Sequence, residues 1–362
     1  MENEVKNDYI EKALNELMPT LGTREFVDHE KIISLINSKK IKEAIKSIAL
    51  YLGLPIEVNI SYVPKGYRPS ANDGFQSTHL VKTDWRGRGS GGITAQVSIP
   101  SNLPFYGMPS MVNFPINVRL SENCAENPAT LISVMAHELS HIVLYSLWHK
   151  EKENEFYTDL TAMLLGFAKI MKTGRKVVKT NTFTESGIFS STTTTHTETT
   201  TYGYLSDDNF NFAFHKIESV LDRQKSAKKK LLKKLKRFKK QLGKTKKLSF
   251  YFEKYLEYLD KNLHQKIAPE DGQKISVFHQ AGHTDNFQSI IRKNETSLEN
   301  FFKFVENLKT YTAGNIETMQ KYEAQLKSAN EELAKQDFLL RKDVDVLKKY
   351  VGFFYKLKLK FT

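Results

Sequence analysis

The stretch "LISVMAHELSHIVLYSLWHKEKENEFYTDLTAMLLGF", residues 131–167, decides how the fold of this chain is interpreted. Its first half contains His137-Glu138-Leu139-Ser140-His141, an HExxH motif among apolar residues. An α-helix returns to the same face every 3.6 residues, so His137 and His141 lie side by side and their imidazoles can bind one metal ion. Glu138 lies one position further round the helix, where its carboxylate can reach a metal-bound water without being a ligand.

Two helices are predicted around this motif. Asn127 is a candidate N-cap, and Pro128 occupies the first helical position, where its missing N–H costs nothing. The first helix should therefore extend from there to about residue 148. A second helix is predicted over about residues 152–171, ending at Gly174.

Two histidines leave a catalytic zinc site incomplete, because such a site takes three protein ligands and a water. The long metzincin pattern would place a glycine and a third histidine at positions 144 and 147, but both are leucine, which excludes that pattern. Glu155 opens the second predicted helix, and an antiparallel return would bring its carboxylate beside the two imidazoles. Asp159, one turn later, can accept a hydrogen bond from the non-ligating nitrogen of a ligand histidine.

The HELSH motif together with Asn154-Glu155-Phe156-Tyr157-Thr158-Asp159 resembles the gluzincin group of zinc metallopeptidases, over about residues 127–171. The resemblance implies a zincin-like domain with three Zn²⁺ ligands, His137, His141 and Glu155. It also implies that Glu138 is the general base and that Asp159 supports His137. The interval between His141 and Glu155 is shorter than in thermolysin-like enzymes and is similar to that of compact bacterial metallopeptidase-like domains.

Peptide hydrolysis also needs a hydrogen-bond donor for the oxyanion that forms when the carbonyl is attacked. Tyr204, just after a Thr-rich stretch, is the first candidate for this catalytic role. A core or capping aromatic is the competing interpretation of Tyr204, and His215 and His196 are weaker candidates for the donor.

An α+β domain is expected over residues 1–206. Apolar residues recur at helical spacing over residues 8–54, with a break at Pro19-Thr20-Leu21-Gly22, which indicates two or three helices. Strand-like alternation follows at 56–63, 92–99 and 114–121, so a small sheet precedes the HExxH helix.

The segment 180–203 is biased toward threonine and serine. A disordered linker is one interpretation of this composition. Its β-branched content and the glycine at 187 also allow a β-hairpin or flap.

A mostly α-helical, coiled-coil-like domain is expected over residues 207–362. Two stripes of apolar residues repeat every seven positions, with 248–263 and 287–308 as further helices of the bundle. The first stripe comprises Phe210, Phe214, Ile217, Leu221, Leu231, Leu235, Phe238 and Leu242. The second comprises Met319, Leu326, Leu333, Leu340, Leu347 and Phe354.

The net charge of +13 arises in one segment. Residues 225–247 contain thirteen Lys and Arg and no Asp or Glu, and the remaining 41 basic residues balance 41 acidic ones. Such a segment can bind nucleic acid, an acidic partner or an anionic membrane surface. It can also be a solvated helix face, because its leucines are committed to packing and lysine far outnumbers arginine.

The sequence thus favours a zinc-dependent peptidase whose helical domain recruits a protein or peptide substrate or a partner. One alternative is a non-catalytic metal-binding protein whose basic arm, 225–247, binds nucleic acid or an acidic partner. Another is a proteolytic toxin or defence effector. We expect a cytoplasmic protein without a transmembrane segment, since there is no signal sequence and only one cysteine, Cys124. The heptad repeats also permit self-association of the chain.

Overall fold

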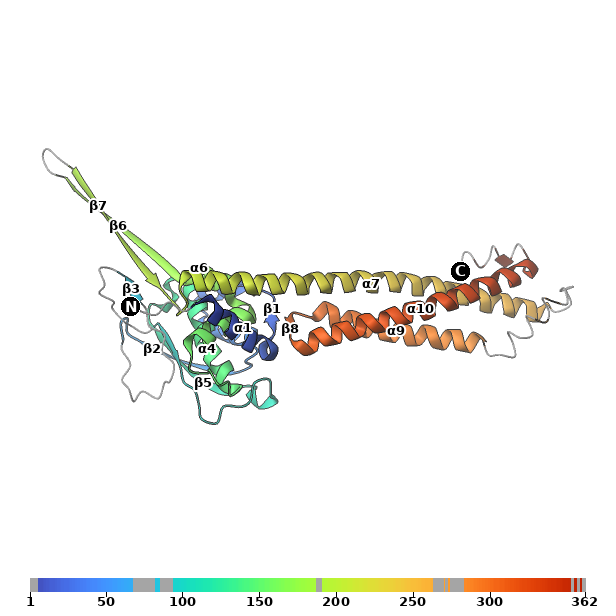
Figure 1. Ribbon diagram of the computed structural model, residues 1–362, viewed down its shortest axis with the longest axis horizontal. Coiled ribbons are helices and arrows are strands. Elements are labelled where there is room, and N and C mark those ends of the chain that lie inside the picture. Colours follow the sequence, from blue (N-terminus) through green and yellow to red (C-terminus); the bar gives the residue numbers. More distant parts are fainter. Residues whose placement is uncertain are drawn as a thin grey trace. The chain divides into compact units, whose positions relative to one another are not determined.

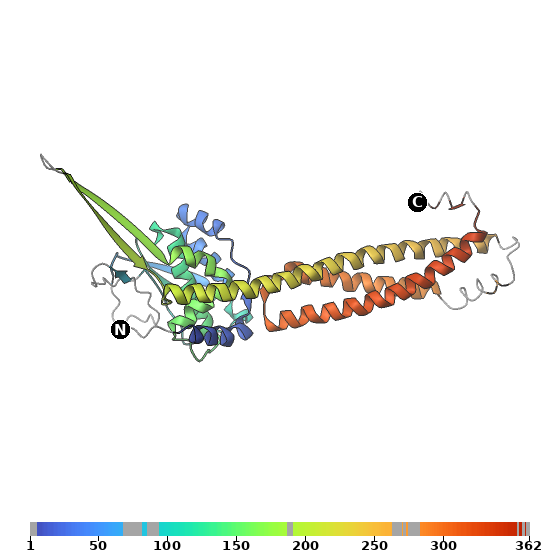
Figure 2. The ribbon, with the colours of Figure 1, turned by 45° about the horizontal axis from the view of Figure 1, so that its top comes forward.

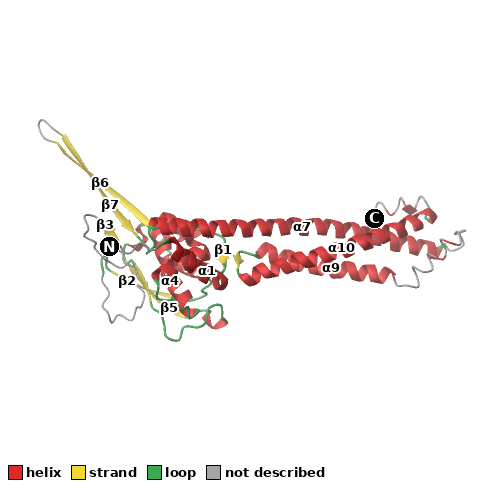
Figure 3. Ribbon diagram, viewed as in Figure 1, coloured by secondary structure: helices red, strands yellow, loops and turns green. Residues whose placement is uncertain are grey.

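The computed structural model describes residues 6–67, 82–84, 94–186, 191–262, 270, 273, 283–352, 355, 356 and 359. Helices dominate these residues and small sheets complete a mixed α+β fold (Figure 3). The chain forms two compact units. Unit 1 comprises Met1–Asp222 with Lys309–Ala313, and unit 2 comprises Arg223–Leu308 with Gly314–Thr362.

Three helices open unit 1, in agreement with the periodicity over residues 8–54. They are α1 (Asn7–Leu21), α2 (Glu30–Asn37) and α3 (Ile41–Tyr51). Pro19 does not break α1, which continues to Leu21 and ends at Gly22 with a φ of 69°. A Cβ on Gly22 would lie 2.7 Å from the carbonyl oxygen of Tyr311, so only glycine fits this close approach.

Unit 1 also contains a three-stranded sheet with the strand order β2-β5-β4. Its strands are β2 (Glu57–Val63), β5 (Pro115–Ser121) and β4 (Ala95–Val97), so all three predicted strands are present and the middle one is shorter than expected. β2 pairs with β5 in parallel and β4 pairs with β5 antiparallel. The sheet packs against α3 and the HExxH helix α4 (Pro128–Ser146), and so supports the helix that carries the motif.

The Thr-rich segment forms a β-hairpin, so the linker interpretation is wrong and the hairpin interpretation is confirmed. β6 (Lys176–Ser186) and β7 (Ser191–Thr201) pair antiparallel along their whole length, and β3 (Lys82–Asp84) pairs with the C-terminal end of β7 (Figure 1). Threonine favours this extended conformation because its branched Cβ suits a pleated strand.

The second predicted helix, 152–171, is wrong in its start and its continuity. It begins three residues later, as α5 (Glu155–Ala162), passes through a π-helical turn η3 (Met163–Phe167) and ends as α6 (Ala168–Gly174). Gly166 interrupts it with a φ of 103°. A Cβ there would lie 2.7 Å from the carbonyl oxygen of Glu25, so only glycine fits this close approach of a segment far away in the sequence.

The expected division at residues 206 and 207 lies inside a compact unit instead. Helix α7 (Asp207–Lys261) begins in unit 1, where Phe210 and Phe214 are buried. Phe214 stacks on Phe26 with ring centroids 5.7 Å apart, and the guanidinium of Arg175 lies 4.5 Å from the Phe210 ring centroid. These contacts join the start of α7 to unit 1.

Unit 2 consists mainly of α7, α9 (His283–Asn307) and α10 (Ala313–Tyr350), which lie side by side (Figures 1 and 2). Both predicted heptad stripes are buried in the described residues, whereas Phe354 lies outside them. The segment 248–263 is not a separate helix, because α7 continues unbroken to Lys261.

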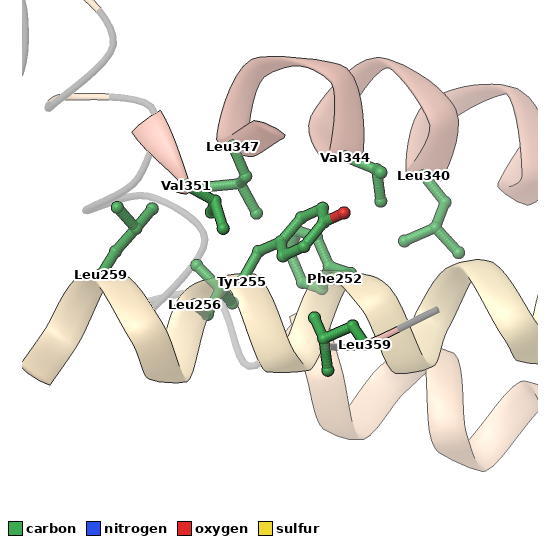
Figure 4. Close-up of a cluster of buried hydrophobic side chains, with 9 residues drawn as sticks. All are labelled: Phe252, Tyr255, Leu256, Leu259, Leu340, Val344, Leu347, Val351 and Leu359. Carbon is green, nitrogen blue, oxygen red and sulfur yellow. The ribbon is translucent and has the colours of Figure 1, made fainter. Parts of the chain in front are cut away.

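α7 and α10 are parallel. Lys234 pairs with Glu323, and further along both helices the hydroxyl of Thr245 donates to Asp337 over 3.1 Å. Beyond this point a buried cluster joins the two helices (Figure 4): Phe252, Tyr255, Leu256, Leu259, Leu340, Val344, Leu347, Val351 and Leu359. Each such side chain contributes roughly 1.5–3 kcal/mol when fully buried.

No described helix combines the length and the apolar content needed to span a bilayer.

Candidate metal centre

Helix α4 is held in the interior of unit 1. The side chain of Asn127 accepts a hydrogen bond from the Thr130 N–H over 3.2 Å, and Pro128 follows it, so the predicted N-cap is confirmed. α4 packs against α3, α5, α6 and β4 and is buried on almost every side. An interior helix fixes its polar side chains, because each must find a partner in the surrounding structure.

A capped turn reverses the chain and aims Glu155 back at α4. The side-chain oxygen of Asn154 accepts from the Phe156 N–H over 3.1 Å, and its amide donates to the Tyr9 hydroxyl over 2.8 Å. Glu155 is therefore the first residue of α5, and α5 packs against α4.

Three side chains meet at one point between these helices. Glu155 Oε2 lies 3.0 Å from His137 Nε2 and 3.3 Å from His141 Nε2. One ligand atom from each residue lies within 4.8 Å of the other two, and the two imidazole rings are 5.1 Å apart in an edge-to-face arrangement. The structure thus brings together the three residues predicted as ligands, as a group able to hold a metal ion.

The donor atoms fit a divalent metal. Among the described residues His141 Nε2 is buried without a hydrogen bond, although it faces the Glu155 carboxylate. Thr158 Oγ1 donates to the Asn154 carbonyl over 3.2 Å and lies 3.4 Å from His141 Nδ1. Since this hydroxyl already donates elsewhere, it can accept from His141 Nδ1–H, an arrangement that turns Nε2 toward the metal-binding group.

Asp159 orients the other imidazole. Its Oδ1 lies 2.7 Å from His137 Nδ1, so the buried carboxylate accepts from Nδ1–H and turns Nε2 toward Glu155. Burial alone would lower the pKa of His137, but the charge of Asp159 and the hydrogen bonds to Asp159 and Glu155 outweigh it and raise that pKa. Burial raises the pKa of Glu155, but the hydrogen bond to His137 and the close approach of the His141 imidazole outweigh it and lower that pKa to about 2.

A turn after the β-hairpin donates two main-chain hydrogen bonds to the second carboxylate oxygen of Asp159. Asp159 Oδ2 accepts from the main-chain N–H of Tyr204 over 2.8 Å and from that of Leu205 over 3.2 Å. Gly203 has a φ of 91°, and a Cβ on it would lie 3.2 Å from Asp159 Oδ2. Sequence reasoning missed both Gly203 and Thr158. A glycine next to Tyr204 and a threonine one residue before Asp159 were the available signals.

Glu138 and Tyr204 border the same group. Glu138 is completely buried, and its charge helps raise the pKa of His137 and that of Tyr204. The Tyr204 ring stacks on the His137 ring with centroids 5.5 Å apart. Burial, followed by the charge of Glu155, raises the pKa of the Tyr204 hydroxyl, so it is protonated at neutral pH.

Of the two weaker candidates for the oxyanion donor, the structure describes the side chain of His215 but not that of His196. His215 is exposed on α7, where its Nδ1 lies 3.5 Å from Glu218, and it does not join the metal-binding group. The side chain of His196 lies outside the described part of the structure.

Comparison with protein-family models, curated proteins and solved structures gave no match to this chain.

Proposed function

We propose that this chain is a zinc-dependent peptidase of gluzincin type, with a zincin-like catalytic domain in unit 1. The observation that carries the proposal is the convergence of His137, His141 and Glu155, each with one ligand atom within 4.8 Å of those of the other two. Two imidazoles and one carboxylate on adjacent helices form the donor set of catalytic zinc in several hydrolases. This set suits zinc better than calcium or magnesium, which prefer oxygen ligands alone.

A bound zinc ion would supply the Lewis acid and would lower the pKa of a bound water toward about 7. His137, His141 and Glu155 would hold it, and Asp159 and Thr158 would keep the two imidazoles in the metal-binding tautomer. Glu138 is next to His137 on α4 and accepts the proton of the attacking water, then delivers it to the leaving amine.

Tyr204 is our candidate for the oxyanion donor. Its raised pKa keeps the hydroxyl protonated, as a donor requires, and the ring is held by its stacking on His137. A protonated hydroxyl at a partly buried position can stabilise negative charge that develops on a substrate carbonyl.

The number of ligands separates this proposal from the non-catalytic alternative. A structural zinc site is usually closed by four protein ligands, whereas a catalytic site keeps one position open for water. Within the described residues the candidate group contains three ligands, not four, which favours the open site. Substrate recruitment by unit 2 and a cytoplasmic location remain predictions.

Glu138→Gln tests the proposal, because it keeps the shape of the side chain and removes the base. Purified zinc-loaded protein would digest a proteome-derived peptide library, with cleavage read by mass spectrometry. We expect cleavage by the wild type, loss of cleavage by at least about a hundredfold in the variant, and equal zinc content in both. Cleavage by the variant at the wild-type rate would exclude Glu138 as the base.

A further inference from the structure

A groove in unit 2 lies between the parallel helices α7 and α10 and has a volume of about 510 Å³. We call it the α7/α10 groove. Its lining residues are Lys234, Arg237, Phe238, Gln320, Glu323, Ala324, Leu326, Lys327 and Asn330. Phe238 and Leu326 are buried residues of the two heptad stripes, so the apolar core of the bundle forms the floor.

The rim of this groove is positively charged. Lys234, Arg237 and Lys327 line it together with a single acidic residue, Glu323, which pairs with Lys234. The charges of Arg237 and Lys327 are not balanced by any further acidic residue of the lining.

A second hollow on the other side of Phe238 and Leu326 provides an internal comparison. Its volume is about 480 Å³, similar to that of the first. Its lining contains one basic residue, Lys293, and one acidic residue, Glu332, and is otherwise uncharged. The second hollow therefore does not share the excess of positive charge found in the α7/α10 groove.

Exposed basic residues continue along α7 beyond the groove. All thirteen basic residues of the segment 225–247 except Lys228 are exposed, and the segment has no acidic residue. A segment of 23 residues in a helix is about 33 Å long. An elongated acidic partner can use this whole length, whereas a small anion would use one or two of the lysines.

We propose that the α7/α10 groove binds an acidic amphipathic helix of a protein partner. The lining residues of α10 extend from Gln320 to Asn330, about 15 Å or three helical turns. The apolar face of a docked helix would contact Phe238 and Leu326, and its acidic side chains would face Arg237 and Lys327. A nucleic acid would satisfy the basic rim but would leave the apolar floor without a complementary surface.

The test measures binding of a designed probe to the full-length protein. The probe is a fluorescent peptide of about 18 residues, long enough to form a helix, with leucine on one face and glutamate on the other. A matched peptide carries lysine in place of glutamate. One double variant, Arg237→Glu/Lys327→Glu, reverses the two unbalanced charges of the groove. The control double variant, Lys293→Glu/Lys303→Glu, makes the same charge change on α9.

We expect saturable binding of the glutamate peptide, weakened at least about tenfold by the α7/α10 reversal and less than about threefold by the α9 reversal. The lysine peptide should not bind. Circular dichroism checks that each variant is folded. The proposal would be overturned if the two double variants had equal effects or if the lysine peptide bound. It would also be overturned if the glutamate peptide did not bind at about 1 mM. Displacement of the peptide by a single-stranded RNA that binds more tightly would instead identify a nucleic-acid surface.

Discussion

The main-chain N–H of Tyr204 donates a hydrogen bond to Asp159 Oδ2 over 2.8 Å. The other oxygen of the same carboxylate lies 2.7 Å from His137 Nδ1. The turn that leaves the β6–β7 hairpin thus fixes a carboxylate, and the carboxylate in turn fixes a candidate metal ligand. Supports of this kind affect metal affinity strongly, because they set the tautomer and the direction of the imidazole.

Gly203→Ala should weaken metal binding. The new Cβ would lie 3.2 Å from Asp159 Oδ2, and alanine is disfavoured at a φ of 91°. We expect about a tenfold loss of zinc affinity, measured by competition with a chromophoric chelator, and a loss of roughly 1–3 kcal/mol in the free energy of unfolding.

Gly107→Ala is the matched control for this change. Gly107 has a φ of 82°, but a Cβ on it would have no neighbour within 4 Å. It should lower stability through backbone strain and leave zinc affinity unchanged. Equal zinc affinities for Gly203→Ala and Gly107→Ala would refute the role of Gly203.

Asp159→Asn should lower zinc affinity by about 10- to 100-fold. The asparagine oxygen can still accept from the N–H groups of Tyr204 and Leu205, but its amide would then donate to His137 Nδ1. The proton of His137 would move to Nε2, where it blocks metal binding. Asp337→Asn, which changes a buried carboxylate in unit 2, should leave zinc affinity unchanged.

Tyr204→Phe isolates the hydroxyl, since phenylalanine keeps the ring that stacks on His137. If the hydroxyl stabilises the oxyanion, kcat should fall by about a hundredfold or more, with zinc content and KM nearly unchanged. Steady-state kinetics on a peptide cleaved by the wild type provides the measurement. An unchanged kcat would show that Tyr204 has only a packing role.

Glu57 should titrate far below its ordinary range. Its carboxylate lies 2.7 Å from Lys42 Nζ and 2.5 Å from Lys46 Nζ, and hydrogen bonds to these two lysines lower its pKa from 4.5 to about 2. The stabilisation is therefore complete above about pH 4.5 and is lost as the pH falls toward 2. A ¹³C NMR titration should give a midpoint near 2 that rises in Lys42→Gln, whereas a midpoint near 4.5 in the wild type would contradict the ion pairs.

The helix that carries the motif and the approach of Glu155 could be predicted from the sequence because local signals specify them. Asn127 and Pro128 define the start of α4, and the spacing of His137 and His141 requires only helical geometry. Glu155 needed one further assumption, that the following helix returns against α4, and α5 does pack there.

The remaining features depend on contacts between distant segments. At the interruption, Gly166 lies against the carbonyl of Glu25, and the approach of Gly203 to Asp159 depends on the hairpin. Composition alone allowed either a linker or a hairpin over residues 180–203. Pairing between β6 and β7 decided between them, and no local pattern encodes that pairing.

Metal content tests the central claim most directly. The wild type and His141→Ala would be incubated with excess Zn²⁺, dialysed against metal-free buffer and analysed by inductively coupled plasma mass spectrometry, with circular dichroism to show that both are folded. Three converging ligands predict about one zinc per wild-type chain and a near-complete loss in the variant. A folded wild type without zinc, or equal zinc in the two proteins, would contradict the account.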